Sequence, residues 1–304
     1  MTPVWLDADP GFDDWLTMLM LAAHPRLHWL GISVVAGNAP LDVTLANALR
    51  IRQHYGLRVP VHAGSALPLC GTLETAQRVL GAQGMRSTGA ALPEVAAHAD
   101  SHDAVAALRA ALHASAEPVL LLAIGPLTNI ALLARDHPLA ARRIGRIIAM
   151  GGAVREPGNI GPHSEFNLFA DPEAAKIVFQ ANLPLTLIPL DVTRRVRASR
   201  ETTSRLAGSA NPAARACSAL IDAYFHSSAG SESRPLHDPC VMLYALAPQL
   251  FDVERLALTI DTGSSRDAGT LAVSKSGTPI DVALGVDGTA ALNLLVRGLL
   301  GSSI

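Results

Sequence analysis

Short, unbroken runs of Val, Ile and Leu alternate with segments of helical periodicity over much of this 304-residue chain. An apolar run without polar alternation is typical of a strand that is covered on both faces. The expected strands are Val4–Leu6, Leu30–Val35, Val59–His62, Val119–Ala123, Ile144–Met150 and Leu183–Leu190. The expected helices between them are Trp15–Ala23, Asp42–Tyr55, Ser101–Ala114, Leu127–Arg135 and Pro172–Gln180. The alternation predicts an α/β fold with a mostly parallel, Rossmann-like central sheet and helices on both faces.

The last third of the chain is more helical. We expect helices over Ala213–Phe225, Cys240–Leu246 and Gly288–Leu300, and a β-hairpin region near Leu256–Leu284. The chain shows no internal repeat and no low-complexity linker, and its length is sufficient for one large core. Residues 1–304 are therefore expected to form a single domain.

Composition excludes several classes of function. Charged residues make up 16% of the chain and the formal net charge is -2, without the basic patch that nucleic-acid binding requires. The longest apolar runs have the length of a strand and are too short to cross a bilayer. Three sparse cysteines form no disulfide framework, which suits a reducing compartment. We therefore expect a cytoplasmic protein with no nucleic-acid and no membrane partner.

Four carboxylates stand within eight residues in the string DADPGFDD, which follows the first expected strand. They are Asp7, Asp9, Asp13 and Asp14. Like charges crowded into one turn repel one another unless positive charge lies among them. Asp is also favoured at a helix N-terminus, but capping accounts for only one or two of the four. Because hard cations such as Ca²⁺ take oxygen ligands, the string predicts a divalent-cation site.

Polar side chains also follow three further strands. They are Asn38, the GPLTN string at 125–129, and the loop from Gly151 to Asn167. In an open α/β sheet, ligands bind outside the carboxyl ends of the strands. The active site is therefore expected at this edge of the sheet.

Five segments together resemble the inosine-uridine-preferring nucleoside hydrolases, a family of metal-dependent N-ribohydrolases. They are DADPGFDD at 7–14, AGN at 36–38, GPLTN at 125–129, GN with EFN at 158–167, and HDP at 237–239. The order and spacing of the segments are also those of the family. The resemblance implies hydrolysis of a ribonucleoside to ribose and free base, with Ca²⁺ as the cofactor. It also implies a homodimer or homotetramer.

The resemblance assigns a role to each matching residue. Asp9 is implied as the general base and as a Ca²⁺ ligand, and Asp7 as a support of the metal site from outside. The other implied ligands are Asp14, Asp238 and the backbone carbonyl of Ile124. The implied ribose-binding residues are Asp13, Asn38, Asn159, Glu165 and Asn167.

The chemistry of the residues agrees with these roles. Hydrolysis of an N-glycosidic bond passes through an oxocarbenium-like sugar, and a water molecule must be deprotonated near C1′. A cation lowers the pKa of water, and an adjacent carboxylate accepts the proton. Asn, Asp and Glu side chains satisfy the donor and acceptor groups of the ribose hydroxyls.

His237 is the candidate acid that protonates the leaving base. A lone His is more often structural, but this one precedes the implied ligand Asp238. A nearby cation would lower its pKa and the carboxylates would raise it, so the balance stays open. In the family, His at this position favours the nonspecific or pyrimidine-handling branch.

Two positions depart from the family pattern. Ile124 stands where the family usually has Thr, although a carbonyl ligand needs no particular side chain. Leu80 precedes Gly81 where a His-Gly pair usually lies near the base. The helix before HDP offers further base contacts in Tyr224, Phe225 and His226, and aromatics at helical spacing are more often core.

Several polar residues receive structural interpretations. Asn129 follows Thr128 and fits a helix N-cap better than a ligand, and Asp171 precedes Pro172 as an N-cap. Asp191 fits a structural residue at a strand end. Glu165 fits a solvated loop charge as an alternative to its ribose-binding role.

Three other functions are weighed against nucleoside hydrolysis. A phosphatase with an Asp nucleophile also has D-x-D after a strand, but the residues that follow here do not continue that motif. An EF-hand fails because Pro10 lies within the loop and Met18 stands where Glu is required. A non-catalytic riboside-binding protein would keep the ribose site, and the retained Asp9 and His237 argue against it.

Overall fold

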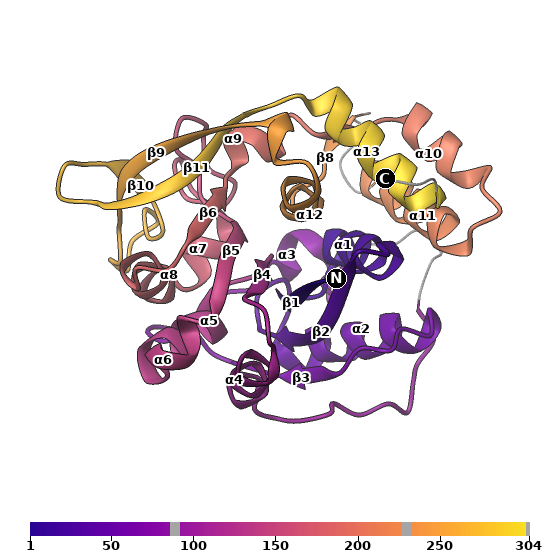
Figure 1. Cartoon of the computed structure of the whole chain (residues 1–304). Coiled ribbons are helices and arrows are strands. Elements are labelled where there is room, and N and C mark those ends of the chain that lie inside the picture. The colour runs from indigo at the N-terminus through magenta and orange to yellow at the C-terminus, as the bar shows by residue number, and fades with distance from the viewer. Residues whose placement is uncertain (86–91, 227–232, 302–304) are drawn as a thin grey trace.

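A computed structural model describes residues 1–85, 92–226 and 233–301. Nine strands form one sheet in the order β10-β9-β11-β6-β5-β4-β1-β2-β3 (Figure 1). Neighbouring strands from β3 to β11 in this order all pair parallel. β9 pairs antiparallel with both of its neighbours, β11 and β10. The strands are β1 Thr2–Ala8, β2 Leu27–Val34, β3 Val61–Ala63, β4 Val119–Ala123, β5 Ile144–Met150, β6 Leu185–Ile188, β9 Phe251–Ile260, β10 Leu271–Val273 and β11 Thr278–Val286. This architecture confirms the predicted α/β class.

Helices cover both faces of the sheet, as Figure 1 shows. One core contains residues of α1 Phe12–Ala23, α2 Leu41–His54, α11 Pro212–His226, α12 Pro239–Leu246 and α13 Gly288–Leu300. The other core contains residues of α4 Ala104–Ala114, α5 Thr128–Asp136, α6 Pro138–Ala141 and α8 Pro172–Gln180. Successive strand residues point to opposite faces, so Leu6 packs in the first core and Trp5 in the second. Burial on both faces explains the unbroken apolar runs of the central strands.

The six predicted strands of the first 190 residues are confirmed, with boundaries that shift by up to a few residues. The shift at the first strand bears on the site, because β1 extends through Asp7 and Ala8. The first helix begins at Phe12 rather than at Trp15, so Asp13 and Asp14 lie in its first turn. Carboxylates are favoured there by the partial positive charge of the helix N-terminus.

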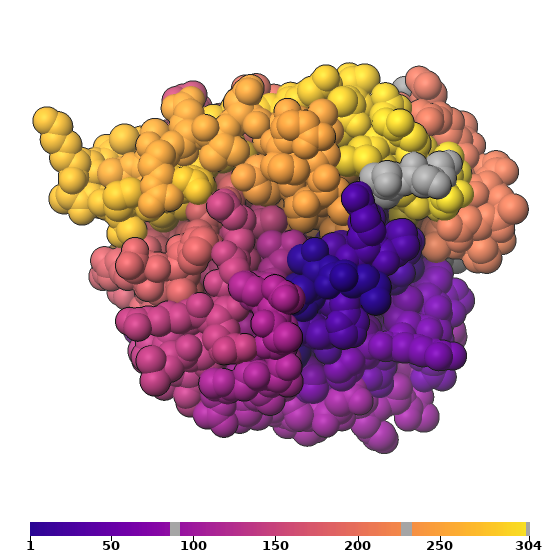
Figure 2. Space-filling model, in the orientation of Figure 1, coloured from indigo at the N-terminus to yellow at the C-terminus, as the bar shows by residue number. Residues whose placement is uncertain are grey.

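The expected hairpin region contains three strands. β9 and β11 pair antiparallel, β10 adds an edge, and β11 also pairs parallel with β6. That last pairing joins the hairpin to the main sheet. The space-filling view places the C-terminal segments, in yellow and orange, against the indigo start of the chain and the magenta middle (Figure 2).

A second, two-stranded sheet was not predicted. It pairs β7 Arg197–Ala198 with β8 Arg234–Pro235, and two residues are too few for a strand pattern to show in the sequence. β8 leads directly into His237 and Asp238, so this pairing fixes where they enter the site. The remaining short helices are α3 Gln77–Leu80, α7 Phe166–Ala170, α9 Leu190–Thr193, α10 Arg200–Ala207 and η1 Pro248–Leu250. Within the described part of the chain, none of the helices has the length and apolarity that crossing a membrane requires.

Candidate active site

Carboxylates from two distant parts of the chain meet beyond the end of β1. Oxygen atoms of Asp13, Asp14 and Asp238 all lie within 4.8 Å of one another. Asp13 and Asp14 belong to the first turn of α1, and Asp238 immediately precedes α12. The backbone N–H of Asp238 lies 3.5 Å from Oδ2 of Asp13. The starts of two helices therefore bring these three side chains into one group that can hold a cation.

Asp9 borders this group and is held by the segment after β2. Its Oδ2 accepts a hydrogen bond from the backbone N–H of Asn38 at 2.7 Å. The side-chain amide of Asn38 donates to the carbonyl of Asp9 at 3.0 Å and to Oδ2 of Asp14 at 3.2 Å. Asn38, expected at the ribose, thus fixes two of the carboxylates relative to each other.

Two glycines leave room for the Asp9 carboxylate. A Cβ atom on Gly125 would lie 2.7 Å from Oδ1 of Asp9, and one on Gly37 would overlap Oδ2. Contacts this short do not occur for real Cβ atoms, so each glycine is required by close approach. Both glycines lie in motifs singled out from the sequence. The need for glycine there could not be seen in the sequence, because it comes from packing between segments far apart in the chain.

The electrostatics of the group favour a bound cation. Burial raises the pKa of Asp9 and Asp238 well above the usual range, and repulsion from neighbouring carboxylates raises each further. Burial, then the charge of Asp13, raises the pKa of Asp14 to about 7. Oδ1 of Asp9 and Oδ1 of Asp14 are buried and have no hydrogen-bond partner among the residues that the structure describes. A hard divalent cation would bond such oxygens and offset the repulsion, so the residues fit the group that the sequence implies.

Asp7 lies within the sheet, two residues before Asp9. It is fully buried, hydrogen-bonds to the hydroxyl of Ser33, and accepts from Nδ2 of Asn129 at 2.9 Å. Oδ1 of Asn129 accepts the backbone N–H of Ser65 at 2.9 Å. The interpretation of Asn129 as a helix cap is therefore wrong, because Leu127 is the N-cap of α5 and Asn129 bridges β1 to the segment after β3.

Glu165 and Asn167 line the end of β5. The Glu165 carboxylate caps α7 and accepts the backbone N–H groups of Gly152 at 2.9 Å and of Asn167. Burial raises the pKa of Glu165 to about 7, so the solvated-charge alternative is wrong. Nδ2 of Asn167 donates to the carbonyls of Ile124 at 3.1 Å and Met150 at 3.2 Å. The carbonyl expected to ligate the metal thus already accepts one hydrogen bond, and a carbonyl has a second lone pair.

Asn159 borders this buried group from the surface, and its side chain interacts with the Glu165 carboxylate. It is exposed on the loop after β5, and its Oδ1 accepts the backbone N–H of Phe166 at 2.9 Å. Of the five residues implied for ribose, Asp13 and Asn38 lie in the carboxylate group, while Asn159, Glu165 and Asn167 are linked through α7.

His237 follows β8 and is held by a hydroxyl. Its Nδ1 lies 2.8 Å from Oγ1 of Thr193. Burial lowers the pKa of His237; Asp13 opposes this, and Arg194 is among the arginines that lower it further. In the cation-free protein the pKa of His237 is therefore lowered, with burial as the main cause.

The residues expected to contact the nucleobase lie in different surroundings. The Tyr224 ring lies 4.5 Å from the Phe12 ring, with the Arg234 guanidinium 4.7 Å from its centre. Phe225 is 1% exposed within the first core, which favours its core interpretation over contact with a base. Leu80 is half-buried in α3. The side chain of His226 lies outside the described residues.

Two further carboxylates tether loops around the site. Asp171 caps α8, as predicted, and also accepts the backbone N–H of Leu69 at 2.9 Å. Asp191 accepts the backbone N–H groups of Val154 at 2.9 Å and Arg155 at 2.7 Å. Its predicted structural role is confirmed, and the loop it holds is the one that continues to Asn159.

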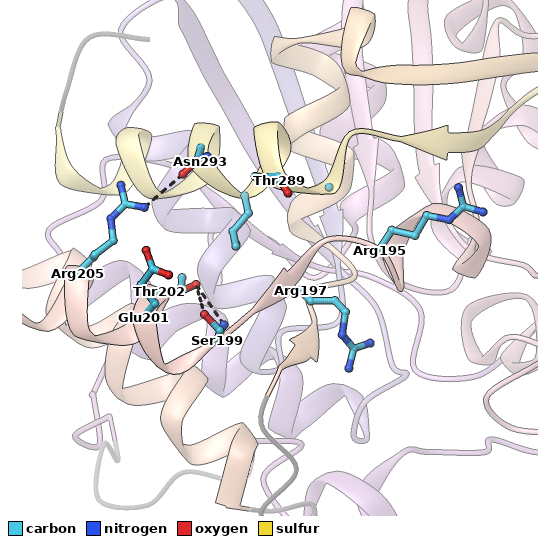
Figure 3. A pocket seen from close by; sticks show the side chains of 10 residues that line it. Arg195, Arg197, Ser199, Glu201, Thr202, Arg205, Thr289 and Asn293 are labelled. Atoms are coloured by element: carbon cyan, nitrogen blue, oxygen red, sulfur yellow. Dashed lines mark hydrogen bonds between the residues drawn. The ribbon is translucent and has the colours of Figure 1, made fainter.

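A cavity of about 340 Å³ elsewhere on the molecule lies between the starts of α10 and α13. Arg195, Arg197 and Arg205 line it, but the head groups of Arg195 and Arg197 point away from its centre (Figure 3). Arg205 instead bonds Oδ1 of Asn293 at 3.3 Å, and Glu201 lies beside it. This cavity lacks convergent ligand groups and contains none of the carboxylates described above.

Comparisons with known proteins agree on one family. The family model described as "Inosine-uridine preferring nucleoside hydrolase" matches residues 4–293. A curated relative from Shewanella sp. (strain ANA-3), named pyrimidine-specific ribonucleoside hydrolase RihA, is 38% identical and covers 98% of this chain and 96% of its own. A solved purine-preferring ribonucleoside hydrolase from Gardnerella vaginalis has a TM-score of 0.89 at 25% identity, covering 99% of this chain and 98% of its own. The plant nucleoside hydrolase PpNRh1 has a TM-score of 0.89 at 26% identity, with 98% and 99% covered.

The raised pKa values predict how a cation stabilises the fold. In the cation-free protein Asp14 binds a proton below about pH 7, and a cation must displace that proton. Stabilisation by Ca²⁺ should therefore be large at about pH 8 and fall towards about pH 5.5. Melting curves with and without Ca²⁺ measure this, with Asp103→Asn as a control on a surface helix cap. A Ca²⁺ shift that does not depend on pH would contradict the assignment.

Gly37 offers a test of the close packing around Asp9. Gly37→Ala places a methyl group against the carboxylate, so Asp9 must move. A displacement of this kind lowers the rate of a catalysed reaction by about 10²-fold. Gly208→Ala is the matched control, because a Cβ there meets nothing closer than 3.7 Å. Equal activity of the two variants would show that the position of Asp9 is not critical.

Proposed function

The chain belongs to the inosine-uridine preferring nucleoside hydrolase family, and from this premise we propose that it is a pyrimidine-preferring ribonucleoside hydrolase with Asp9 as its base and His237 as its acid. Members of this family are enzymes that hydrolyse the N-glycosidic bond of ribonucleosides. The observation that carries the proposal is the meeting of the DADPGFDD carboxylates with Asp238, next to His237.

Asp9 has the geometry of a general base. One of its oxygens, Oδ2, is fixed by the Asn38 N–H and keeps a second lone pair that can accept a proton from water, whereas Oδ1 has no partner among the described residues and is left for the cation. A held carboxylate with one free lone pair meets the geometric requirement for this role. The negative charge of the neighbouring carboxylates also favours the positive oxocarbenium-like sugar over the neutral substrate.

Ca²⁺ is the proposed cofactor. Asp9, Asp14, Asp238 and the carbonyl of Ile124 would hold it, with Asp13 left for the ribose. When bound, the ion makes a nearby water molecule easier to deprotonate. Oxygen ligands of this type suit Ca²⁺, which accepts irregular coordination.

The remaining polar residues are proposed to bind the ribose. Asp13, Asn38, Asn159, Glu165 and Asn167 provide donors and acceptors for three hydroxyl groups. A site that hydrogen-bonds the 2′-hydroxyl leaves buried polar groups unpaired when the substrate lacks that hydroxyl. Strong discrimination against deoxyribonucleosides is therefore part of the proposal.

The proposed base preference rests on two observations. Curated relatives at 37–38% identity are named pyrimidine-specific ribonucleoside hydrolases. His237 occupies the position that favours the nonspecific or pyrimidine-handling branch. Neither the phosphatase nor the riboside-binding alternative is favoured, because the relatives are named hydrolases. We also propose a single domain over 1–304, a cytoplasmic location and a homo-oligomeric state.

Release of free ribose from uridine, cytidine and inosine tests the reaction and the preference together. We expect uridine and cytidine to react faster than inosine, a chelator to stop the reaction, and added Ca²⁺ to restore it. Faster release from inosine would contradict the pyrimidine preference. Undiminished release in chelator would contradict the cation requirement.

Asp9→Asn tests the general base. The amide keeps the shape of the side chain but accepts no proton, so kcat for uridine should fall by about 10²–10⁴-fold. Asp103→Asn, the same change at an exposed helix cap, should leave kcat unchanged. Calorimetry with Ca²⁺ measures how far Asp9→Asn also weakens binding of the ion. An Asp9→Asn enzyme with wild-type kcat would exclude Asp9 as the base.

A further inference from the structure

A buried threonine contacts the candidate acid and has no role in the mechanism described so far. Thr193 is the last residue of α9 and is fully buried. Its Oγ1 lies 2.8 Å from Nδ1 of His237 and makes no other hydrogen bond within the described part of the chain. Nε2 of the same ring bonds to no residue of the described ranges, so it is the nitrogen left for a substrate.

A hydroxyl oxygen carries lone pairs and can accept the proton that Nδ1 holds. In that arrangement Nδ1 keeps its proton, and Nε2 is the nitrogen that gives a proton to the substrate. The contact with Thr193 therefore fixes the orientation of the ring through the nitrogen that does not react.

The helical turn that carries Thr193 is itself fixed on both sides. Asp191 accepts two backbone N–H groups of the loop after β5. Arg194 donates to the carbonyls of Pro157 at 2.7 Å and Gly158 at 2.9 Å. A side chain on an element held this firmly can fix the orientation of its neighbour closely.

We propose that Thr193 is a positioning residue for protonation of the leaving base, holding the His237 ring through Nδ1 so that Nε2 faces the departing nucleobase. The inference rests on the proposed function, in which His237 is the acid. When the C1′–N bond breaks, its electron pair passes to the base nitrogen, which takes the proton from Nε2. The ring is left neutral, with its remaining proton on Nδ1 donated to Oγ1 of Thr193. Asp9 holds the proton of the attacking water, and that proton returns through solvent to restore the imidazolium.

The proposal predicts an effect that depends on the leaving group. A nucleobase needs a proton as it departs, whereas 4-nitrophenolate is stable as an anion and needs none. Thr193→Val keeps the shape and removes the hydroxyl. It should lower kcat/KM for uridine by about tenfold or more and leave that for 4-nitrophenyl riboside within about threefold.

The experiment compares the ratio of the two kcat/KM values in wild type, Thr193→Val, Thr193→Ser and His237→Ala. The ratio does not depend on how much of a variant is folded, because the active fraction cancels. We expect Thr193→Val and His237→Ala to depress the ratio in the same direction. Thr193→Ser, which restores a hydroxyl, should return the ratio towards wild type.

Three results would overturn the inference. A wild-type ratio in Thr193→Val, alongside a depressed ratio in His237→Ala, would leave the acid in place and remove Thr193 from its positioning. Equal losses on both substrates in Thr193→Val would show a merely structural role. A wild-type ratio in His237→Ala would remove the acid on which the inference rests. Failure of the proposed function would be visible separately, as absence of ribose release from uridine by the wild-type enzyme.

Discussion

Mutual repulsion among buried carboxylates is the constraint on which the rest of the site depends. The end of β1 and the first turn of α1 place Asp9, Asp13 and Asp14 together, and the start of α12 adds Asp238. The protein offsets part of the cost with hydrogen bonds from Asn38 and from the Gly11 backbone N–H, which bonds Oδ2 of Asp14 at 2.8 Å. Two buried oxygens nevertheless have no partner, and none of the ion pairs formed within the described ranges involves these four residues. A divalent cation would offset the remaining repulsion among these carboxylates.

The order of strands in the sheet brings the other site residues to these carboxylates. β1 lies between β2 and β4, so the segments after those strands reach Asp9 from both sides. The segment after β5 adds Glu165 and Asn167, and Asn167 reaches back to the carbonyl of Ile124. On the far side, α9 joins the loop after β5 to His237. In the proposed reaction, negative charge would lie where the sugar becomes positive, and the imidazole of His237 would face the departing base.

Much of the fold was predictable because the central strands are buried on both faces and leave unbroken apolar runs. The motif residues could be singled out because their segments resemble those of the family, and the structure brings Asp13, Asp14 and Asp238 together. The β7–β8 pair was missed because two-residue strands carry no periodic signal. Asn129 was misassigned because its partners, Asp7 and Ser65, are distant in sequence, and only the folded sheet brings them together. The contact between Thr193 and His237 likewise depends on two segments that meet only in space.

Calorimetric titration of the cation-free protein with Ca²⁺ tests the central claim most directly. The account predicts one ion per chain, with protons released on binding near neutral pH because the pKa of Asp14 is raised to about 7. Replacement of Asp14 or Asp238 by Asn should abolish that binding. Absence of saturable binding, or binding that survives both replacements, would contradict the assignment of the carboxylate group as the cation site.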